Sequence, residues 1–110
     1  MTSWSDWALF PDPRQRKYIS APFGPGVYEL RRSDTKELVL RGMGRNCAYR
    51  MASLLPEPLG QDTRKNAKKR AYVFEHLEHI EYRTYPCASE SEAQALEVQF
   101  HRDQPCLFPT

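Results

Sequence analysis

The stretch that decides the fold reads GVYELRRSDTKELVLRG, residues 26–42. Its two halves, 26–32 and 37–42, are rich in β-forming residues, and the polar residues 33–36 between them make a turn of hairpin length. The stretch therefore predicts a β-hairpin. Alternation along the strands assigns Tyr28 and Leu30 to one face of the first strand, and Leu38, Leu40 and Gly42 to one face of the second.

The residues after the hairpin predict further helices and a third strand. Asn46 is a predicted N-cap, and the helix that follows it ends before Pro56. A second helix is predicted over residues 64–77, and residues 79–85 alternate as the third strand.

The last predicted helix has a clear start and a clear buried face. Ser89 is followed three residues later by Glu92, which is the spacing of a capping box. Ala93, Leu96 and Phe100 then recur at the spacing of one helix face. We therefore expect a helix that begins near Ser89 and packs this face against the sheet.

Together these elements predict a small α/β (α+β) domain, in which a three-stranded, mostly antiparallel sheet is flanked by about three helices. We assign residues 26–110 to a single compact domain. Residues 1–25 carry four of the nine prolines and are expected to form an irregular N-terminal arm. Within the arm, Trp4, Trp7 and Phe10 have the spacing of one face of a short helix, which we expect to dock on the domain.

Composition limits the classes of protein to consider. A chain of 110 residues with a net charge of +2 fits one globular domain, and this charge points to no particular partner. The three cysteines are odd in number and lack C-x-x-C spacing, which indicates reduced thiols in a cytoplasmic protein. No apolar run approaches the ~18 residues of a membrane span, and the N-terminus lacks a signal-peptide pattern. From the small format we expect a bacterial or phage origin.

Two predicted helices each carry a charged residue on a face that should be apolar. Arg50 joins the face of the helix after the hairpin, and Glu97 lies between Ala93 and Phe100 on the last helix. One interpretation is a buried ion pair between them. The other is a cleft in which Arg50 binds a phosphate, Glu97 binds a divalent metal and Tyr28 projects from the sheet. Spacing alone leaves both open.

Four features of the chain, taken in order, resemble the motif series of the GIY-YIG nuclease family. They are GVY at 26–28, LRG at 40–42, Arg50 eight residues later, and EAQALE ending at Glu97. The resemblance runs from Gly26 to the C-terminus. It implies a DNA endonuclease that hydrolyses phosphodiester bonds with a divalent metal, usually Mg²⁺, with Mn²⁺ as a substitute.

By position, the resemblance implies the roles of five residues. Gly26 and Gly42 correspond to glycines of the two triplets, Tyr28 to the first tyrosine, Arg50 to the helix arginine and Glu97 to the metal-binding glutamate. These roles agree with the chemistry of phosphodiester hydrolysis. A tyrosine can take up or relay the proton of the attacking water, although a phenol with a pKa of about 10 needs help from its surroundings. The planar arginine fits phosphate oxygens, and the carboxylate suits a hard metal ion.

The chain departs from the family pattern at two positions. Leu40 replaces the tyrosine of the second triplet, and Leu54 occupies a position that is often polar in the family. Arg41 neighbours Leu40, but alternation points it to the opposite face of the sheet. The predicted second helix offers three side chains that could fill the gap: Lys68, Lys69 and His76.

Residues 64–70 form a basic run. Taken alone, such a run most often belongs to a solvated helix face. Taken together with the resemblance, the run is predicted to contact nucleic acid by binding phosphates, without sequence specificity. The residues concerned are Arg64, Lys65, Lys68, Lys69 and Arg70. The main alternative to a nuclease is a DNA-binding module of the same fold that has lost turnover through Leu40 and Leu54.

Three other functions have weaker support. His76 and His79 with Cys47 or Cys87 could supply zinc ligands, but no close cysteine pair accompanies them. Cys47 near a helix N-terminus could be a reactive thiol, but it also fits the predicted core face. Finally, Trp4, Trp7 and Phe10 could bind a protein partner or a second copy of the chain.

Overall fold

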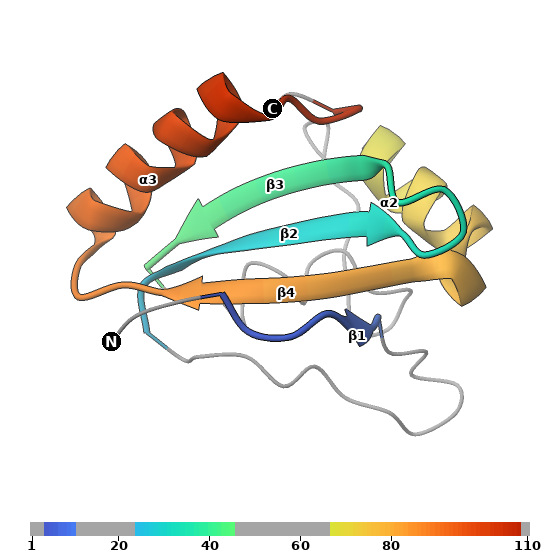
Figure 1. The fold of residues 1–110 in the computed structure, drawn as a ribbon, viewed down its shortest axis with the longest axis horizontal. Helices are drawn as coiled ribbons and strands as arrows, with labels where there is room; N and C mark the ends of the chain where they lie inside the picture. Colours follow the sequence, from blue (N-terminus) through green and yellow to red (C-terminus); the bar gives the residue numbers. More distant parts are fainter. Residues whose placement is uncertain (1–3, 11–23, 46–66, 109–110) are drawn as a thin grey trace.

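The computed structural model describes residues 4–10, 24–45 and 67–108. These residues form an antiparallel sheet of four strands in the order β1-β4-β2-β3, with helices beside it (Figure 1). The strands are β1 (Ala8–Leu9), β2 (Gly26–Arg32), β3 (Leu38–Gly44) and β4 (Ile80–Pro86). The helices are α2 (Ala67–Glu75), the 3-10 helix η2 (Leu77–His79) and α3 (Glu90–Asp103). The predicted α+β class is confirmed, and β1 adds a fourth strand to the three that the sequence predicts.

The predicted hairpin is confirmed as β2 and β3. Tyr28 pairs with Gly42 and Leu30 with Leu40, so these four residues share one face of the sheet. The register then shifts, because Arg31 pairs with Leu38 and leaves Val39 as an extra residue on β3. The bulge corrects the prediction that Leu38 lies on the face of Leu40: Leu38 is opposite Arg31, and Val39 joins the core instead.

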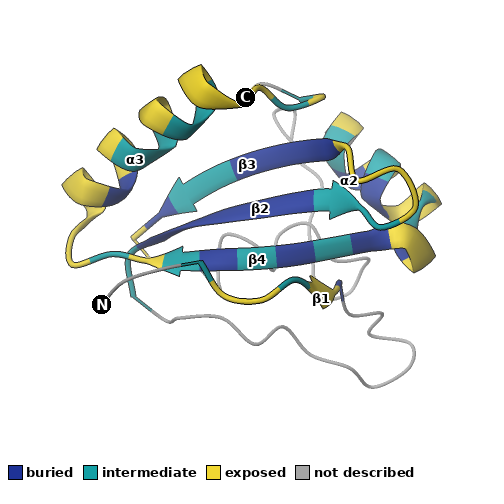
Figure 2. Ribbon diagram, in the orientation of Figure 1, coloured by how far each residue is buried: buried dark blue, intermediate teal, exposed yellow. Residues whose placement is uncertain are grey.

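The hydrophobic core lies on the face of the sheet that carries Leu30 and Leu40. Helix α2 contributes Val73 to it, and the 3-10 helix η2 contributes Leu77. Figure 2 shows the three long strands largely buried, whereas α3 is mostly exposed. The buried core cluster consists of Phe10, Tyr28, Leu30, Val39, Leu40, Val73, Leu77, Ile80 and Tyr82.

The described helices differ slightly from their predicted bounds. Residues 64–66 and the whole helix predicted after Asn46 lie outside the described residues. Helix α2 ends at Glu75 rather than at Leu77, and β4 begins at Ile80 because residues 77–79 form η2. Across the described ranges, no helix has the length and apolar character needed to cross a membrane.

The predicted cap of α3 is confirmed. The Ser89 hydroxyl accepts a hydrogen bond from the backbone N–H of Glu92 at 3.1 Å, which satisfies one of the free donors of the first turn. Figure 1 shows α3 leaving the end of β4 and running beside β3. After α3 the chain returns to β3, where Phe108 forms a parallel bridge with Leu40.

The short helix predicted at Trp4 to Phe10 is wrong, because residues 4–10 contain no helix and Ala8–Leu9 form β1. Ala8 and Leu9 pair with β4, and the N–H of Phe10 donates to the carbonyl of Ile80 at 2.8 Å. The physical reason is that β4 offers unpaired backbone groups along its outer side, and pairing satisfies them. The prediction that this segment docks on the domain is confirmed, since Phe10 is buried in the core.

Replacing Ser89 with alanine is expected to destabilise the protein by about 1 kcal/mol, because α3 loses its N-cap. Urea unfolding followed by circular dichroism measures the change. Ser91→Ala is the matched control, since Ser91 is an exposed residue within the helix where alanine is favourable. An equal loss of stability in both variants would contradict the capping role.

Candidate functional site

The ring of Tyr28 lies directly across Gly42 on the neighbouring strand. The two residues are paired in register, and a Cβ atom added to Gly42 would overlap the Tyr28 Oη and Cζ atoms. Tyr28 is buried, with 7% of its surface exposed. Glycine is therefore needed at position 42 so that the tyrosine can lie flat on the strand, and the two predicted motif residues form one structural unit.

Glu97 lies on the side of α3 that faces the sheet. Ala93, one turn earlier, is fully buried, and the ring of Phe100 packs on Trp4 and Tyr85. Glu97 itself is half-buried, so the stripe predicted from the sequence is confirmed. Helix α3 starts from the end of β4 that pairs with Gly26, only two residues along β2 from Tyr28. The two elements meet at one end of the sheet, but on different faces: Phe100 of the Glu97 stripe packs on Tyr85, which pairs with Val27 and so points away from Tyr28.

Several predicted site residues lie outside the described residues. These are Arg50, Leu54, Arg64 and Lys65, together with Cys47. The predicted phosphate-binding role of Arg50, and its alternative as an ion-pair partner of Glu97, therefore stay predictions. Gly26 is described, and it is buried at the start of β2 between Gly44 and Pro86.

The residue that replaces the second-triplet tyrosine belongs to the core. Leu40 is 1% exposed and pairs with Leu30, so it offers no polar group to a site. Its neighbour Arg41 points to the opposite face, as alternation predicts, and it is buried there with 3% exposed. The centre of the sheet therefore has an apolar face and a second face that contains a buried charge.

A buried ionic network fills this second face. One oxygen of the Glu29 carboxylate, Oε2, accepts from Arg41 Nε at 2.6 Å and also pairs with Arg41 Nη2. The other oxygen, Oε1, accepts from Arg83 Nε at 2.7 Å and lies 2.6 Å from Arg83 Nη2. Glu29 is 1% exposed, so its charge is compensated by two planar guanidinium groups rather than by water.

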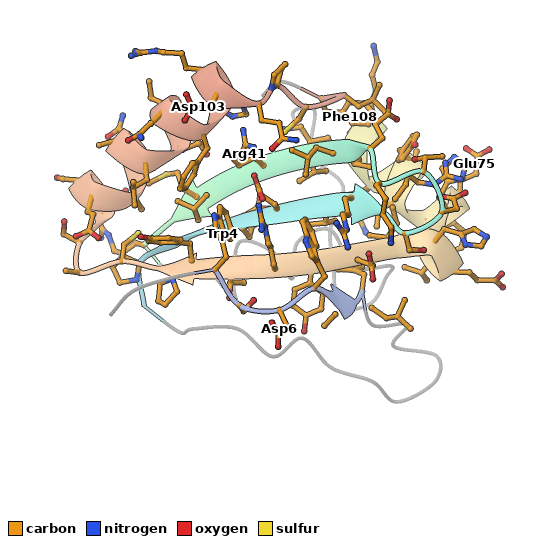
Figure 3. All side chains as sticks on the ribbon, viewed as in Figure 1. Trp4, Asp6, Arg41, Glu75, Asp103 and Phe108 are labelled. Carbon is orange, nitrogen blue, oxygen red and sulfur yellow. The ribbon has the colours of Figure 1, made fainter. Side chains whose placement is uncertain are left out.

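Arg41 extends the network from the sheet to the end of α3. Its Nη1 donates to the backbone carbonyl of Gln104 at 3.1 Å and contacts Nδ1 of His101 at 3.2 Å. Because arginine has no acceptor, His101 Nδ1 must accept, and the ring proton lies on Nε2. Figure 3 shows Arg41 between strand β3 and helix α3.

The other arginine of the network is covered by the N-terminal arm. The guanidinium of Arg83 lies 4.2 Å from the ring centre of Trp4 and 4.6 Å from that of Trp7. Arg31 lies 4.1 Å from the ring of Trp7 and pairs with Glu81 at 2.9 Å. These cation–π contacts hold both tryptophans on the chain's own sheet.

Sequence reasoning missed Glu29, Arg83 and His101 as members of one network. A signal for part of it was present, since alternation in the predicted hairpin puts Glu29 and Arg41 on the faces opposite Tyr28 and Leu40, and the two residues are paired in the structure. Arg83 of β4 pairs with Glu29 of β2, but these two strands are far apart in the sequence. No local pattern indicates it.

The basic residues of α2 have different surroundings. Lys68 is exposed, Lys69 is half-buried, and Arg70 is buried with 7% exposed. His76, just beyond α2, packs on the ring of Tyr72 with 4.5 Å between the ring centres. Burial and Arg41 lower the pKa of His101 at the end of α3, and the charge of Lys69 lowers it further.

Charged groups at the end of α3 also affect a thiol in the tail. Burial raises the pKa of the Cys106 thiol; Arg41 lowers it, and the carboxylates of Glu29 and Glu97 raise it. Glu97 thus belongs to the electrostatic surroundings of the network. Within residues 4–10, 24–45 and 67–108, no group of three or more histidine, cysteine or acidic side chains is placed to bind a metal ion together. His76, His79 and Cys87, weighed above as zinc ligands, therefore form no such group.

Replacing Gly42 with alanine is expected to destabilise the protein by about 1–3 kcal/mol, because the new methyl group forces the Tyr28 ring from its place. Chemical denaturation measures the cost. In a Tyr28→Ala background the same substitution meets no ring and should cost far less. An equal cost in both backgrounds would contradict the packing of Tyr28 on Gly42.

Acidification is expected to destabilise the fold through His101. Burial and Arg41 lower its pKa, Glu29 opposes this, and Lys69 lowers it further. Below about pH 6.5 the unfolded chain takes up the proton while the folded chain resists it, so stability that is present above this pH is lost as the pH falls through the folded-state pKa.

Urea unfolding between about pH 5 and pH 8 measures this effect, with His101→Asn as the comparison. The variant keeps an acceptor near the position of Nδ1 but does not titrate, so its stability should depend less on pH. Identical pH profiles for the two proteins would show that His101 is not responsible.

No protein-family model and no curated protein sequence matches this chain. Among solved structures, it is similar to the GIY-YIG N-terminal endonuclease domain of UvrC from Thermotoga maritima, bound to its catalytic divalent cation, magnesium. The TM-score is 0.65 at 21% sequence identity, and the match covers 92% of this chain and 100% of that one. The resemblance inferred from the motifs is therefore confirmed for the fold: this chain has a GIY-YIG-like fold.

Proposed function

We propose that this protein is a divalent-metal-dependent endonuclease that hydrolyses phosphodiester bonds in DNA. The observation that carries the proposal is the GIY-YIG-like fold of the chain, within which Tyr28 lies flat on Gly42 in the sheet and Glu97 is half-buried on α3. All the proposed catalytic residues belong to the domain 26–110, and β1 of the N-terminal arm pairs with its sheet.

The donor chemistry of Glu97 fits a magnesium ion. Mg²⁺ prefers oxygen ligands and keeps several waters, so one or two carboxylates together with substrate phosphate suffice to hold it. Glu97 supplies such a carboxylate, half-buried at a helix face. The similar UvrC domain is bound to magnesium as its catalytic divalent cation. When bound, the ion would supply positive charge for the phosphate and for the leaving oxygen.

The remaining roles fall to side chains of the chain itself. The phenol of Tyr28 is the proposed group that takes up or relays the proton of the attacking water. Its position on Gly42 fixes the ring, so the hydroxyl is presented in one place. Arg50 is the proposed phosphate-binding residue, because its planar guanidinium can donate two hydrogen bonds to the non-bridging oxygens.

DNA is the proposed partner, and the basic residues of the second helix are its proposed contacts. Lys68 is exposed and Lys69 half-buried, which suits them to bind phosphates. Arg70 is buried, so its proposed contribution is smaller than the sequence alone predicts. The arm is a weak basis for a protein partner or a dimer, because Phe10 is buried and both tryptophans pack on the sheet.

A DNA-binding module without turnover is the second candidate, and the burial of Leu40 favours it. The side chain that replaces the family's tyrosine lies in the core and adds no hydroxyl to the site. Both functions predict DNA binding that weakens with salt. Only the nuclease predicts cleavage that needs a divalent metal.

Replacing Glu97 with glutamine is expected to reduce DNA cleavage by at least about 100-fold, because the proposed metal ligand loses its charge. The assay compares labelled linear, nicked, flapped and branched DNA, each with Mg²⁺, with Mn²⁺ and with a chelator. Glu92→Gln is the matched control, since it removes an exposed carboxylate from the same helix.

Metal-dependent cleavage that survives Glu97→Gln would contradict the role of Glu97. If the wild type binds DNA in a salt-sensitive manner but cuts none of these substrates, the binding module is the better description. DNA binding should then be reduced by charge-removing substitution of Lys68 and Lys69.

A further inference from the structure

The helix that carries Glu97 makes polar contacts at both ends, with Arg41 in β3 and with Arg45 just after β3. One of these contacts is exposed and the other is buried. Near its start, Glu90 pairs with Arg45 at 3.1 Å, and the Arg45 side chain is 85% exposed. Near its end, His101 and the carbonyl of Gln104 both contact Arg41, which is buried. Exposed ion pairs contribute little, so of these polar contacts the buried one adds most to the apolar packing of Ala93 and Phe100 in fixing the helix.

We propose that Arg41 is a positioning residue for the nuclease site, which it serves by fixing the end of α3 and thereby the place of the Glu97 carboxylate. The proposal rests on the proposed function. It assigns a purpose to the residue at the centre of the altered second triplet, LRG, whose side chain points away from Tyr28.

The guanidinium of Arg41 is itself buried and paired with Glu29. Glu29 accepts from Nε and pairs with Nη2, which leaves Nη1 for α3. Glu29 is in turn held by Arg83, on which the arm places Trp4 and Trp7. A planar fork fixed on two of its nitrogens presents the third in one direction, which lysine cannot do.

The contact on α3 is suited to this role. Carbonyls in the last turn of a helix have no partner within the helix, and they carry partial negative charge that favours a cation. Arg41 satisfies one of them at Gln104. His101 is one turn after Glu97, about 6 Å along the helix axis, so a displacement at His101 moves the carboxylate with it.

The metal-binding purpose can be tested with two substitutions at one position. His101→Leu removes one of the two acceptors that Arg41 Nη1 contacts on α3 and leaves the Gln104 carbonyl, whereas His101→Asn replaces Nδ1 by an amide oxygen at nearly the same distance from the backbone. Mn²⁺ binding to the full chain, without DNA, is measured by calorimetry at about pH 8, where the wild-type ring is neutral. Amide hydrogen exchange in α3 is measured on the same samples.

We expect His101→Leu to bind Mn²⁺ about 10-fold more weakly than wild type and to exchange faster in the last turns of α3. We expect His101→Asn to restore both properties. Glu90→Gln is the control, since it removes the exposed contact of the same helix and should leave Mn²⁺ affinity unchanged. Arg41→Lys should weaken Mn²⁺ binding in the same direction as His101→Leu.

Two results would overturn the positioning role. Wild-type affinity in His101→Leu would show that the contact does not set the place of Glu97. Equal weakening in His101→Leu and His101→Asn would show that the imidazole matters for another reason than accepting from Arg41. If the wild type binds no Mn²⁺ at all, the proposed function fails, and the positioning role fails with it. This outcome can be told from the two above, because no variant then differs from the wild type in Mn²⁺ binding.

Discussion

The described structure depends on the pairing of the Glu29 carboxylate with Arg41 and Arg83. Glu29 lies at the middle of β2 and has almost no access to water. Taking such a charge out of water costs several kcal/mol in practice, which only excellent pairing geometry offsets. Both oxygens here are bound by guanidinium groups, one from each neighbouring strand. Removal of one partner would leave a buried charge uncompensated, which costs about 3–5 kcal/mol in other proteins.

The same carboxylate connects parts of the chain that the sheet alone would leave apart. Through Arg41 it reaches the last turn of α3, and through Arg83 it reaches the aromatic side chains of the N-terminal arm. The two faces of the sheet therefore do different work. One buries the apolar core and Tyr28, and the other uses ionic and cation–π contacts to attach the elements that follow and precede the strands.

Much of this fold was predictable because its determinants are local. The hairpin, the capping box at Ser89 and the helix stripe containing Glu97 each depend on residues close in sequence. The spacing of such residues indicates which face of a strand or helix they occupy. The failures have the opposite origin. The pairing of β1 with β4 joins residues more than seventy positions apart, and the Val39 bulge changes alternation without any glycine or proline to indicate it. Glu29 looked like an ordinary polar residue of a half-exposed strand, because its partner Arg83 comes from β4.

The return of the chain to β3 after α3 has a consequence for how copies of this protein behave together. The N–H groups of Leu107 and Phe108 donate to the carbonyls of Leu38 and Val39, so the tail occupies hydrogen-bonding positions that another molecule could use. At the opposite side of the sheet, β1 is only two residues long. A sheet whose outermost strand is short, or already paired, is a poor template for strand addition, so both described edges of this sheet disfavour edge-to-edge aggregation.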